Sequence, residues 1–232
     1  MLILLVCTEG EVSEPAYIEA LKSQLGGQMP RGKTSQVEIL PIPLGGNHGH
    51  KKLIERAQKA INDAIKDQDS ILYIANEIDE DVTIERWLIC DYDEMDNRRI
   101  DIKQLRRQAR QEGFNLVVSK PRFEVFVLLH FLDIDEVAKI DPSNLNGAIN
   151  REVEKLNKLN VKTKANVSEV ILIPKKYGKK KYQAQTFFGK MLNLNPELID
   201  KALQHSPDYR SHYFSDMPEL IKRIRSVLTE KD

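Results

Sequence analysis

Cysteine is scarce in this chain, and its two copies, Cys7 and Cys90, each come at the end of an apolar run. Two thiols in 232 residues provide neither a disulfide framework nor a cysteine-based zinc site, so we expect buried thiols in a reducing compartment. The apolar run at the N-terminus is short, has no basic segment before it and leads directly into acidic residues. These features favour a first strand over a signal peptide or a membrane span, and we expect a cytoplasmic protein with no membrane partner.

An excess of either charge is also missing, because Lys+Arg and Asp+Glu both number 35 and the formal net charge is +0. Nucleic-acid-binding proteins often carry a positive balance, so this composition weighs slightly against one. The charges are nevertheless segregated, with acidic residues crowded into residues 77–101 and five lysines within 175–181. The sequence has no internal repeat or long low-complexity tract, and 41% of it is hydrophobic, which is enough for a buried core.

Apolar runs of strand length alternate with helical patterns over the first 132 residues. Strands are expected at 2–7, 37–42, 84–90 and 114–118, and helices at 13–25, 51–66, 101–112 and 123–132. This order predicts an α/β fold with a parallel sheet flanked by helices. Beyond residue 133 the pattern becomes mainly helical, at 145–159, 184–193, 196–204 and 217–229, with one strand-like run at 167–173. We therefore divide the chain into a sheet domain, 1–132, and a mainly helical C-terminal extension, 133–232.

Acidic residues follow two of the expected strands directly. Glu9 and Glu11 come after the first strand, and Asp91 and Asp93 come after the strand at 84–90. Ligands of open α/β sheets bind outside the carboxyl ends of the strands, so these side chains are expected to face one crevice. Clustered carboxylates repel one another, and a hard cation such as Mg²⁺ removes that cost. The pattern indicates a metal site built by Glu9, Asp91 and Asp93, with Glu11 available to a second ion. Either cluster taken alone fits a solvated loop equally well.

Three segments of the chain resemble the motifs of a known family. They are residues 8–17 (TEGEVSEPAY), residues 91–94 (DYDE) and residues 119–131 (SKPRFEVFVLLHF). They resemble the motifs of RloB-like proteins, which read close to EGE-x-TEP-x-Y, Asp-x-Asp-Glu and SNP-x-FELWLLLHF. The resemblance covers about residues 1–132 well and the remainder weakly. The chain departs from the family at Tyr92, Lys120 and Arg122, where Arg, Asn and Cys are usual, but no departure removes a carboxylate.

The resemblance implies a Toprim-like domain in which Glu9 acts as acid or base while Asp91 and Asp93 bind Mg²⁺ or Mn²⁺. RloB-like proteins occur in bacterial mobile defence loci, often beside an ATPase, and related Toprim effectors cut nucleic acid. We therefore expect a metal-dependent nuclease of DNA or RNA that serves anti-phage defence, with an ATPase partner as its controller. A homo-oligomer is compatible with this expectation.

Two basic segments are candidates for contact with the nucleic acid. Lys120 and Arg122 precede the helix expected at 123–132, and they suit either a phosphate contact or a solvated helix start. The second segment has lysines between and beside two tyrosines, which suits phosphate contact with base stacking, or else a solvated loop. Its lysines are Lys175, Lys176, Lys179, Lys180 and Lys181.

Five further residues are weaker candidates or are expected to have structural roles. Glu14 is favoured as a helix N-terminal residue that interacts with the helix dipole, and Glu124 needs a partner such as the metal or Lys120 if it points inward. His130 lies on an apolar helix and is expected to be a packed core residue. The two histidines of the loop at 45–50 have no third ligand nearby, so we favour a solvated loop there over a metal site.

Two other functional classes remain open from the sequence. The chain could be a non-catalytic subunit that uses the acidic crevice for Mg²⁺-bridged binding of a nucleotide or nucleic acid, or for docking a basic partner surface. The balanced charge favours this slightly. A primase-like nucleotidyl transferase is the other, although nothing in the sequence requires it. Metal-dependent cleavage that is lost on Glu9→Ala would separate a nuclease from a binding subunit.

Overall fold

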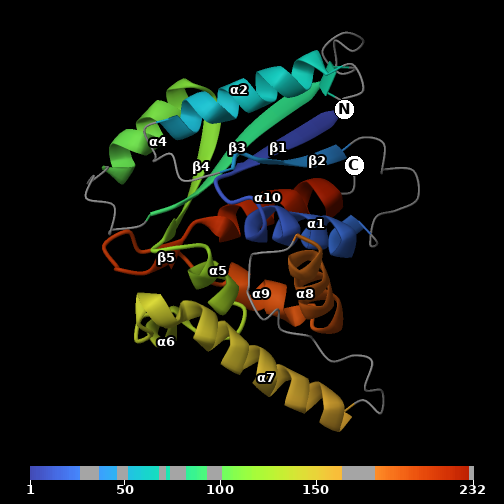
Figure 1. Cartoon of the computed structure of the whole chain (residues 1–232), viewed down its shortest axis with the longest axis vertical. Coiled ribbons are helices and arrows are strands. Elements are labelled where there is room, and N and C mark those ends of the chain that lie inside the picture. Colours follow the sequence, from blue (N-terminus) through green and yellow to red (C-terminus); the bar gives the residue numbers. More distant parts are fainter. Residues whose placement is uncertain are drawn as a thin grey trace.

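The computed structural model describes residues 1–26, 37–45, 52–67, 72–73, 82–92, 101–163 and 181–229. Within them, five strands form one sheet in the order β2-β1-β3-β4-β5 (Figure 1). The strands are β1 (Leu2–Thr8), β2 (Val37–Pro43), β3 (Thr83–Asp91), β4 (Phe114–Lys120) and β5 (Phe214–Ser215). The first four are mutually parallel and β5 is antiparallel to β4. The predicted α/β class with a mainly parallel sheet is confirmed.

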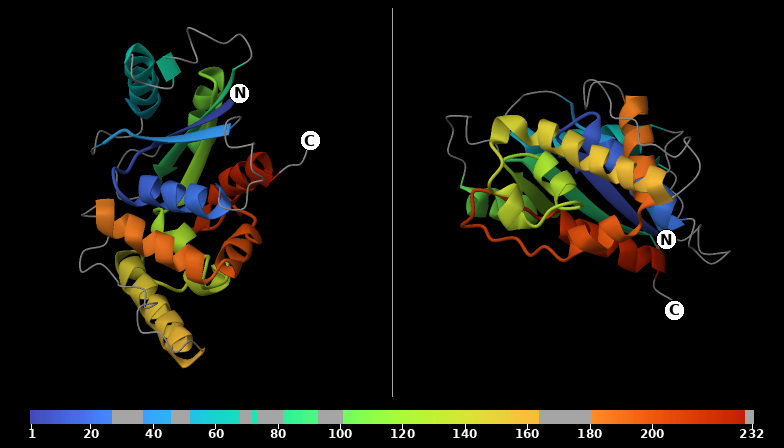
Figure 2. Two further views of the ribbon diagram at one scale, coloured as in Figure 1. Left: turned by 90° about the vertical axis from the view of Figure 1, so that its right-hand side faces the viewer. Right: turned by 90° about the horizontal axis from the view of Figure 1, so that it is seen from below.

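Helices cover both faces of this sheet, as Figures 1 and 2 show. One face carries α2 (Leu53–Lys66) and α4 (Ile102–Gln111). The other face carries α1 (Ser13–Gly26) and α10 (Met217–Thr229), with further helices packed beyond them. These are α5 (Glu124–Leu128), α6 (Ile134–Val137), the 3₁₀ turn η2 (Pro142–Asn144), α7 (Leu145–Thr163), α8 (Lys181–Leu194) and α9 (Glu197–Leu203). No helix of the described chain is both long and apolar enough to span a membrane.

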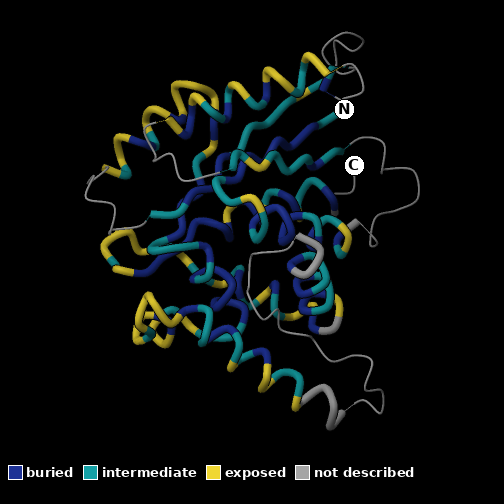
Figure 3. Tube along the Cα trace, in the orientation of Figure 1, coloured by how far each residue is buried: buried dark blue, intermediate teal, exposed yellow. Residues whose placement is uncertain are grey.

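Alternation along the strands divides the buried side chains between the two faces. In β1, Leu4 and Val6 belong to the core under α1 and α10, whereas Ile3 and Leu5 belong to the core under α2 and α4. Successive strand residues point to opposite faces, so a run that is apolar throughout is the expected pattern for a parallel strand covered on both sides. Figure 3 shows this buried interior, with exposed positions on the outer sides of α2 and α4.

The C-terminal part of the chain shares its core with the sheet. Phe188 of α8 and Ile221 of α10 lie in the same buried cluster as Leu4 of β1. Arg223 of α10 also donates to Glu85 of β3, with its Nε at 3.1 and 3.2 Å from the two carboxylate oxygens. The helices after residue 133 therefore cover one face of the sheet rather than packing only on each other.

Two local differences separate the structure from the sequence-based expectation, and a third expectation is not tested. The strand β5 was not predicted, because two residues are too few to show an alternating pattern. The helix expected at 123–132 is shorter, since the backbone after Leu128 turns through tighter bonds, such as His130 N to Val127 O at 3.3 Å. The strand-like run at 167–173 lies outside the described residues.

Candidate functional site

Parallel pairing brings the ends of β1 and β3 together. Thr8 pairs with Ile89, and the backbone N–H of Glu9 donates to the carbonyl of Ile89 at 3.0 Å. The backbone N–H of Asp91 in turn donates to Oε2 of Glu9 at 3.1 Å. Glu9 and Asp91, which are 82 positions apart in sequence, therefore meet at the carboxyl edge of the sheet, where sequence reasoning expected them.

Asp91 lies in a desolvated and negatively charged environment. Its Oδ1 accepts a hydrogen bond of 2.7 Å from the backbone N–H of Phe123, which favours the charged form. Desolvation, followed by the charges of Glu14, Glu124 and Glu9, nevertheless raises the pKa of Asp91 well above its usual range. A carboxylate that is difficult to ionise alone is one that a nearby cation would stabilise.

Glu14 is the most enclosed of these acids, with 6% of its surface exposed. Desolvation raises its pKa from 4.5 to about 7, and the charges of Glu124 and Glu9 add to this effect, while backbone N–H groups of Glu14 and Gly10 oppose it. The carboxylate folds back over Gly10, where a Cβ would collide with its oxygens. Residue 10 must be glycine for Glu14 to hold this position.

Glu124 completes a set of four acids drawn from four elements. It begins α5, its side chain is 17% exposed, and Nε of Arg122 lies 3.9 Å from its Oε2. The set comprises the residue after β1, the first turn of α1, the end of β3 and the first turn of α5. We call it the carboxylate cluster, and its members are Glu9, Glu14, Asp91 and Glu124.

Two members of the cluster were only weaker candidates in the sequence. Glu14 was favoured as a helix-dipole residue, and it does lie in the first turn of α1, but its carboxylate turns inward. Glu124 was expected to need a partner if it pointed inward. It lies beside Arg122, and its charge raises the pKa values of Glu14 and Asp91. Both residues lie inside the segments that resemble the family motifs, and that placement was the signal that favoured a site role.

Other predicted site residues are placed differently. Glu11 is exposed, and its carboxylate lies over Gly45 after β2, whose φ of +64° also requires glycine. Asp93 lies outside the described residues, as do Lys175, Lys176, Lys179 and Lys180. Lys181 begins α8, and its side chain is not described.

Lys120 and Arg122 both have partners within the protein. The ammonium of Lys120 lies 5.4 Å from the centre of the Tyr92 ring, which is a cation–π geometry. Arg122 donates to the carbonyl of Pro142 at 2.8 Å in addition to its contact with Glu124. Arg122 therefore lies beside the carboxylate cluster through Glu124, and a phosphate contact by either cation remains a prediction.

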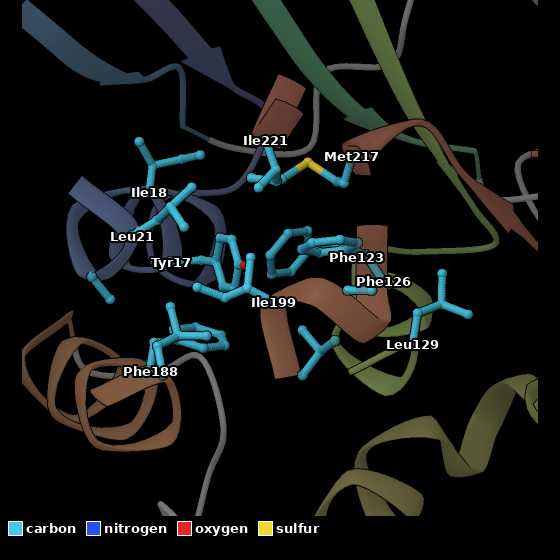
Figure 4. Close-up of a cluster of buried hydrophobic side chains, with 14 of the residues drawn as sticks. Tyr17, Ile18, Leu21, Phe123, Phe126, Leu129, Phe188, Ile199, Met217 and Ile221 are labelled. Carbon is cyan, nitrogen blue, oxygen red and sulfur yellow. The ribbon is translucent and has the colours of Figure 1, made fainter. Parts of the chain in front are cut away.

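A buried Tyr17–His130 pair fixes the two helices that carry Glu14 and Glu124. The Tyr17 hydroxyl and His130 Nε2 are 2.9 Å apart, and His130 Nδ1 is 3.1 Å from the carbonyl of Phe126. Since a carbonyl only accepts, Nδ1 carries the proton and Nε2 accepts from Tyr17. Burial lowers the pKa of His130 to about 4, so the ring is neutral at pH 7. The predicted core role of His130 is confirmed by its complete burial, and Figure 4 shows Tyr17 beside Phe126 and Phe188.

The chemistry of the cluster suits a hard divalent cation. All its side-chain ligands are carboxylate oxygens, which Mg²⁺ prefers, and their mutual repulsion is the cost that such an ion removes. Across the described ranges, however, no three or more His, Cys, Asp or Glu side chains are arranged as a ready metal-binding group. The described acids therefore fit a cation by type and by charge rather than as a closed coordination shell.

Comparison with known proteins gives one match. The family model of RloB-like protein matches residues 3–224, which is nearly the whole chain. The chain therefore belongs to the RloB-like family, and the family assignment made from its motifs is confirmed and extended beyond residue 132. No curated protein and no solved structure matches it.

Proposed function

We propose that this protein is a metal-dependent nuclease of the Toprim type, which hydrolyses phosphodiester bonds of DNA or RNA at the carboxylate cluster. The observation that carries this proposal is the convergence of Glu9, Glu14, Asp91 and Glu124 at the carboxyl edge of a parallel sheet, where burial and the neighbouring acids raise the cost of ionising Glu14 and Asp91. Buried carboxylates with raised pKa values that gather at one edge of a sheet are typical of functional sites.

The residues have distinct roles in this proposal. Asp91, with Asp93 two residues later, would hold Mg²⁺ or Mn²⁺, and Glu9 would either bind the ion or move a proton. The bound ion would supply neutralisation of the phosphate and of the charge that develops on the leaving oxygen. Glu11 would contribute to a second ion. Lys120 and Arg122 would position the phosphate, as would the lysines of residues 175–181.

Family membership supports the cellular part of the proposal. We propose that the enzyme acts in the cytoplasm as an effector of anti-phage defence under the control of an ATPase partner. This part rests on the resemblance to proteins of bacterial defence loci and on no contact seen in the structure.

The proposal is tested by a cleavage assay of the purified protein on single-stranded and duplex DNA and RNA with Mg²⁺, Mn²⁺ or EDTA. Cutting should require the metal and should fall by at least about a hundredfold in Asp91→Asn and in Glu9→Gln, since each removes a charge from the cluster. Glu154→Gln is the matched control, because Glu154 is an exposed acid of α7.

A second function has one observation in its favour. The described residues hold no ready group of three metal ligands, which suits a subunit that binds nucleic acid or a basic partner surface without cutting. Binding of nucleic acid in Mg²⁺ or Mn²⁺ without cleavage, even after the ATPase partner is added, would establish this alternative and exclude the nuclease.

A further inference from the structure

The outer side of α4 is strongly basic. Its ten residues include Lys103, Arg106, Arg107 and Arg110 and no acidic residue. These four side chains, with Gln111, line a cavity of about 470 Å³. Lys103, Arg107 and Arg110 are exposed, and their side chains form no ion pair with another residue of the described ranges. Clustered cations of this kind attract a polyanion.

An exposed aromatic ring adjoins these cations. The guanidinium of Arg106 lies 4.1 Å from the centre of the Tyr209 ring, and Tyr209 is 45% exposed. Among the described residues it is the one large hydrophobic side chain that is exposed. The edge of Phe214 supports the same ring at a centroid distance of 5.1 Å. Tyr209 is therefore held in place while part of its ring stays open to solvent.

Arg106 anchors this surface to the sheet. It pairs with Asp216, whose side chain is buried and also accepts from the backbone N–H of Val118 at 3.2 Å. Glu219 of α10 borders the surface, where it interacts electrostatically with Arg106 and Arg110. Asp101 caps the start of α4 and Asp208 precedes Tyr209, so the positive charge is concentrated on the exposed side chains of Lys103, Arg107 and Arg110. We call it the α4 surface, and it comprises Lys103, Arg106, Arg107, Arg110, Gln111 and Tyr209.

The α4 surface lies close to the carboxylate cluster. Val118, which holds Asp216, precedes Ser119, and Ser119 pairs with Asp91 across the sheet. Cys90, which precedes Asp91, lies in the buried core under α2 and α4. A strand bound along α4 would therefore have to pass the carboxyl edge of β3 and β4 to reach the cluster, whose Glu14 and Glu124 come from helices of the opposite face.

We propose that the α4 surface binds single-stranded nucleic acid, with Lys103, Arg107 and Arg110 on phosphates and Tyr209 stacked on an unpaired base. A duplex offers phosphates but keeps its bases stacked inside, so the combination of cations and an open aromatic ring selects a single strand. That the strand then reaches the carboxylate cluster rests on the proposed nuclease function, whereas the binding itself does not.

The test is fluorescence anisotropy of the full chain with labelled single-stranded DNA, single-stranded RNA and duplex DNA in EDTA, so that no cutting is required. Arg107→Glu/Arg110→Glu should weaken single-strand binding about tenfold or more and reduce the slope of log K against log salt by about 1.4, for two lost phosphate contacts. Arg106 is left intact because it pairs with buried Asp216. The control Lys139→Glu/Lys158→Glu changes the net charge equally at exposed positions beyond α6 and on α7, and should bind as the wild type does.

Substitutions of Tyr209 test the single-strand preference. Tyr209→Ala should weaken single-strand binding about fivefold or more and leave duplex binding unchanged, while Tyr209→Phe keeps the ring and should retain binding. Equal binding by Arg107→Glu/Arg110→Glu and the control would show that the α4 surface does not bind nucleic acid. An equal effect of Tyr209→Ala on single strands and duplexes would show that it has no preference for single strands. Binding that behaves as expected, together with no cleavage in the separate assay with Mg²⁺ or Mn²⁺, would support this inference and count against the proposed nuclease alone.

Discussion

Burial of Glu14 makes its protonation sensitive to pH near neutrality. Its pKa is about 7 in the folded protein and near 4.5 for an exposed glutamate, so the folded state binds more protons between these two values. Its contribution to the free energy of unfolding is complete below about pH 4.5 and is lost as pH rises through about 7. Without metal, the folded protein should therefore lose stability across this interval.

Glu14→Gln should remove that loss. Above pH 7 the metal-free variant should be more stable than the wild type by as much as roughly 3 kcal/mol, and the difference should shrink towards pH 4.5. Urea unfolding in EDTA at a series of pH values measures it. Glu19→Gln, on the same helix and only partly buried, is the control. A difference between Glu14→Gln and the wild type that does not change with pH would contradict the protonation of Glu14.

The hydrogen bond between Tyr17 and His130 makes a second residue-scale prediction. Tyr17→Phe would leave Nε2 of His130 buried without its donor, and should lower the free energy of unfolding by about 1–3 kcal/mol. In a His130→Leu background the same substitution should cost much less, because no acceptor remains to be left unsatisfied. Urea unfolding of the four proteins gives the coupling energy, and additive losses would show that the pair is not a functional hydrogen bond.

At the scale of helices and strands, α4 depends on a side-chain cap. Oδ1 of Asp101 accepts from the backbone N–H of Lys103 at 2.9 Å and so satisfies one of the unpaired donors at the helix start. Asp101→Ala should lower the free energy of unfolding by about 1 kcal/mol, while Asp101→Asn should retain most of it. Equal losses in both variants, measured by urea unfolding, would argue against the cap.

The elements could be predicted from sequence where their patterns are long. The continuous apolar run of β1 indicates a strand that is buried on both faces. The regularly spaced apolar positions of α2 indicate a helix that is buried on one face. Two-residue β5 has no such pattern, and its pairing with β4 depends on contacts such as Ser119 with Ser215, which are 96 positions apart. Long-range contacts of this kind are decided by packing, which periodicity does not encode.

The candidate site was predictable only where its residues follow directly from strand order. Glu9 and Asp91 could be brought together from strand order, because parallel strands end at one edge of the sheet. The inward turn of Glu14 could not, since an acid in the first turn of a helix usually lies in solvent near the helix dipole. Tyr17 and His130 are 113 positions apart, so their hydrogen bond has no local signal at all.

On the scale of the whole molecule, one core joins the sheet to the C-terminal helices. Phe126, Phe188 and Ile221 come from three parts of the chain and lie in a single buried cluster. The full chain should therefore unfold in one cooperative transition in urea, with fluorescence and circular dichroism coinciding. A fragment of residues 1–132 should not reach native stability, because it leaves this face of the core exposed. Two separate transitions would show instead that the division at residue 133 is a boundary of independent stability.

The central claim is that the carboxylate cluster holds a divalent cation, and calorimetric titration of the wild type and Asp91→Asn with Mn²⁺ tests it most directly. The wild type should bind Mn²⁺, and Asp91→Asn should lose at least about tenfold in affinity, while Glu154→Gln should bind as the wild type does. Binding of the same strength in Asp91→Asn, or no binding by the wild type, would contradict the account.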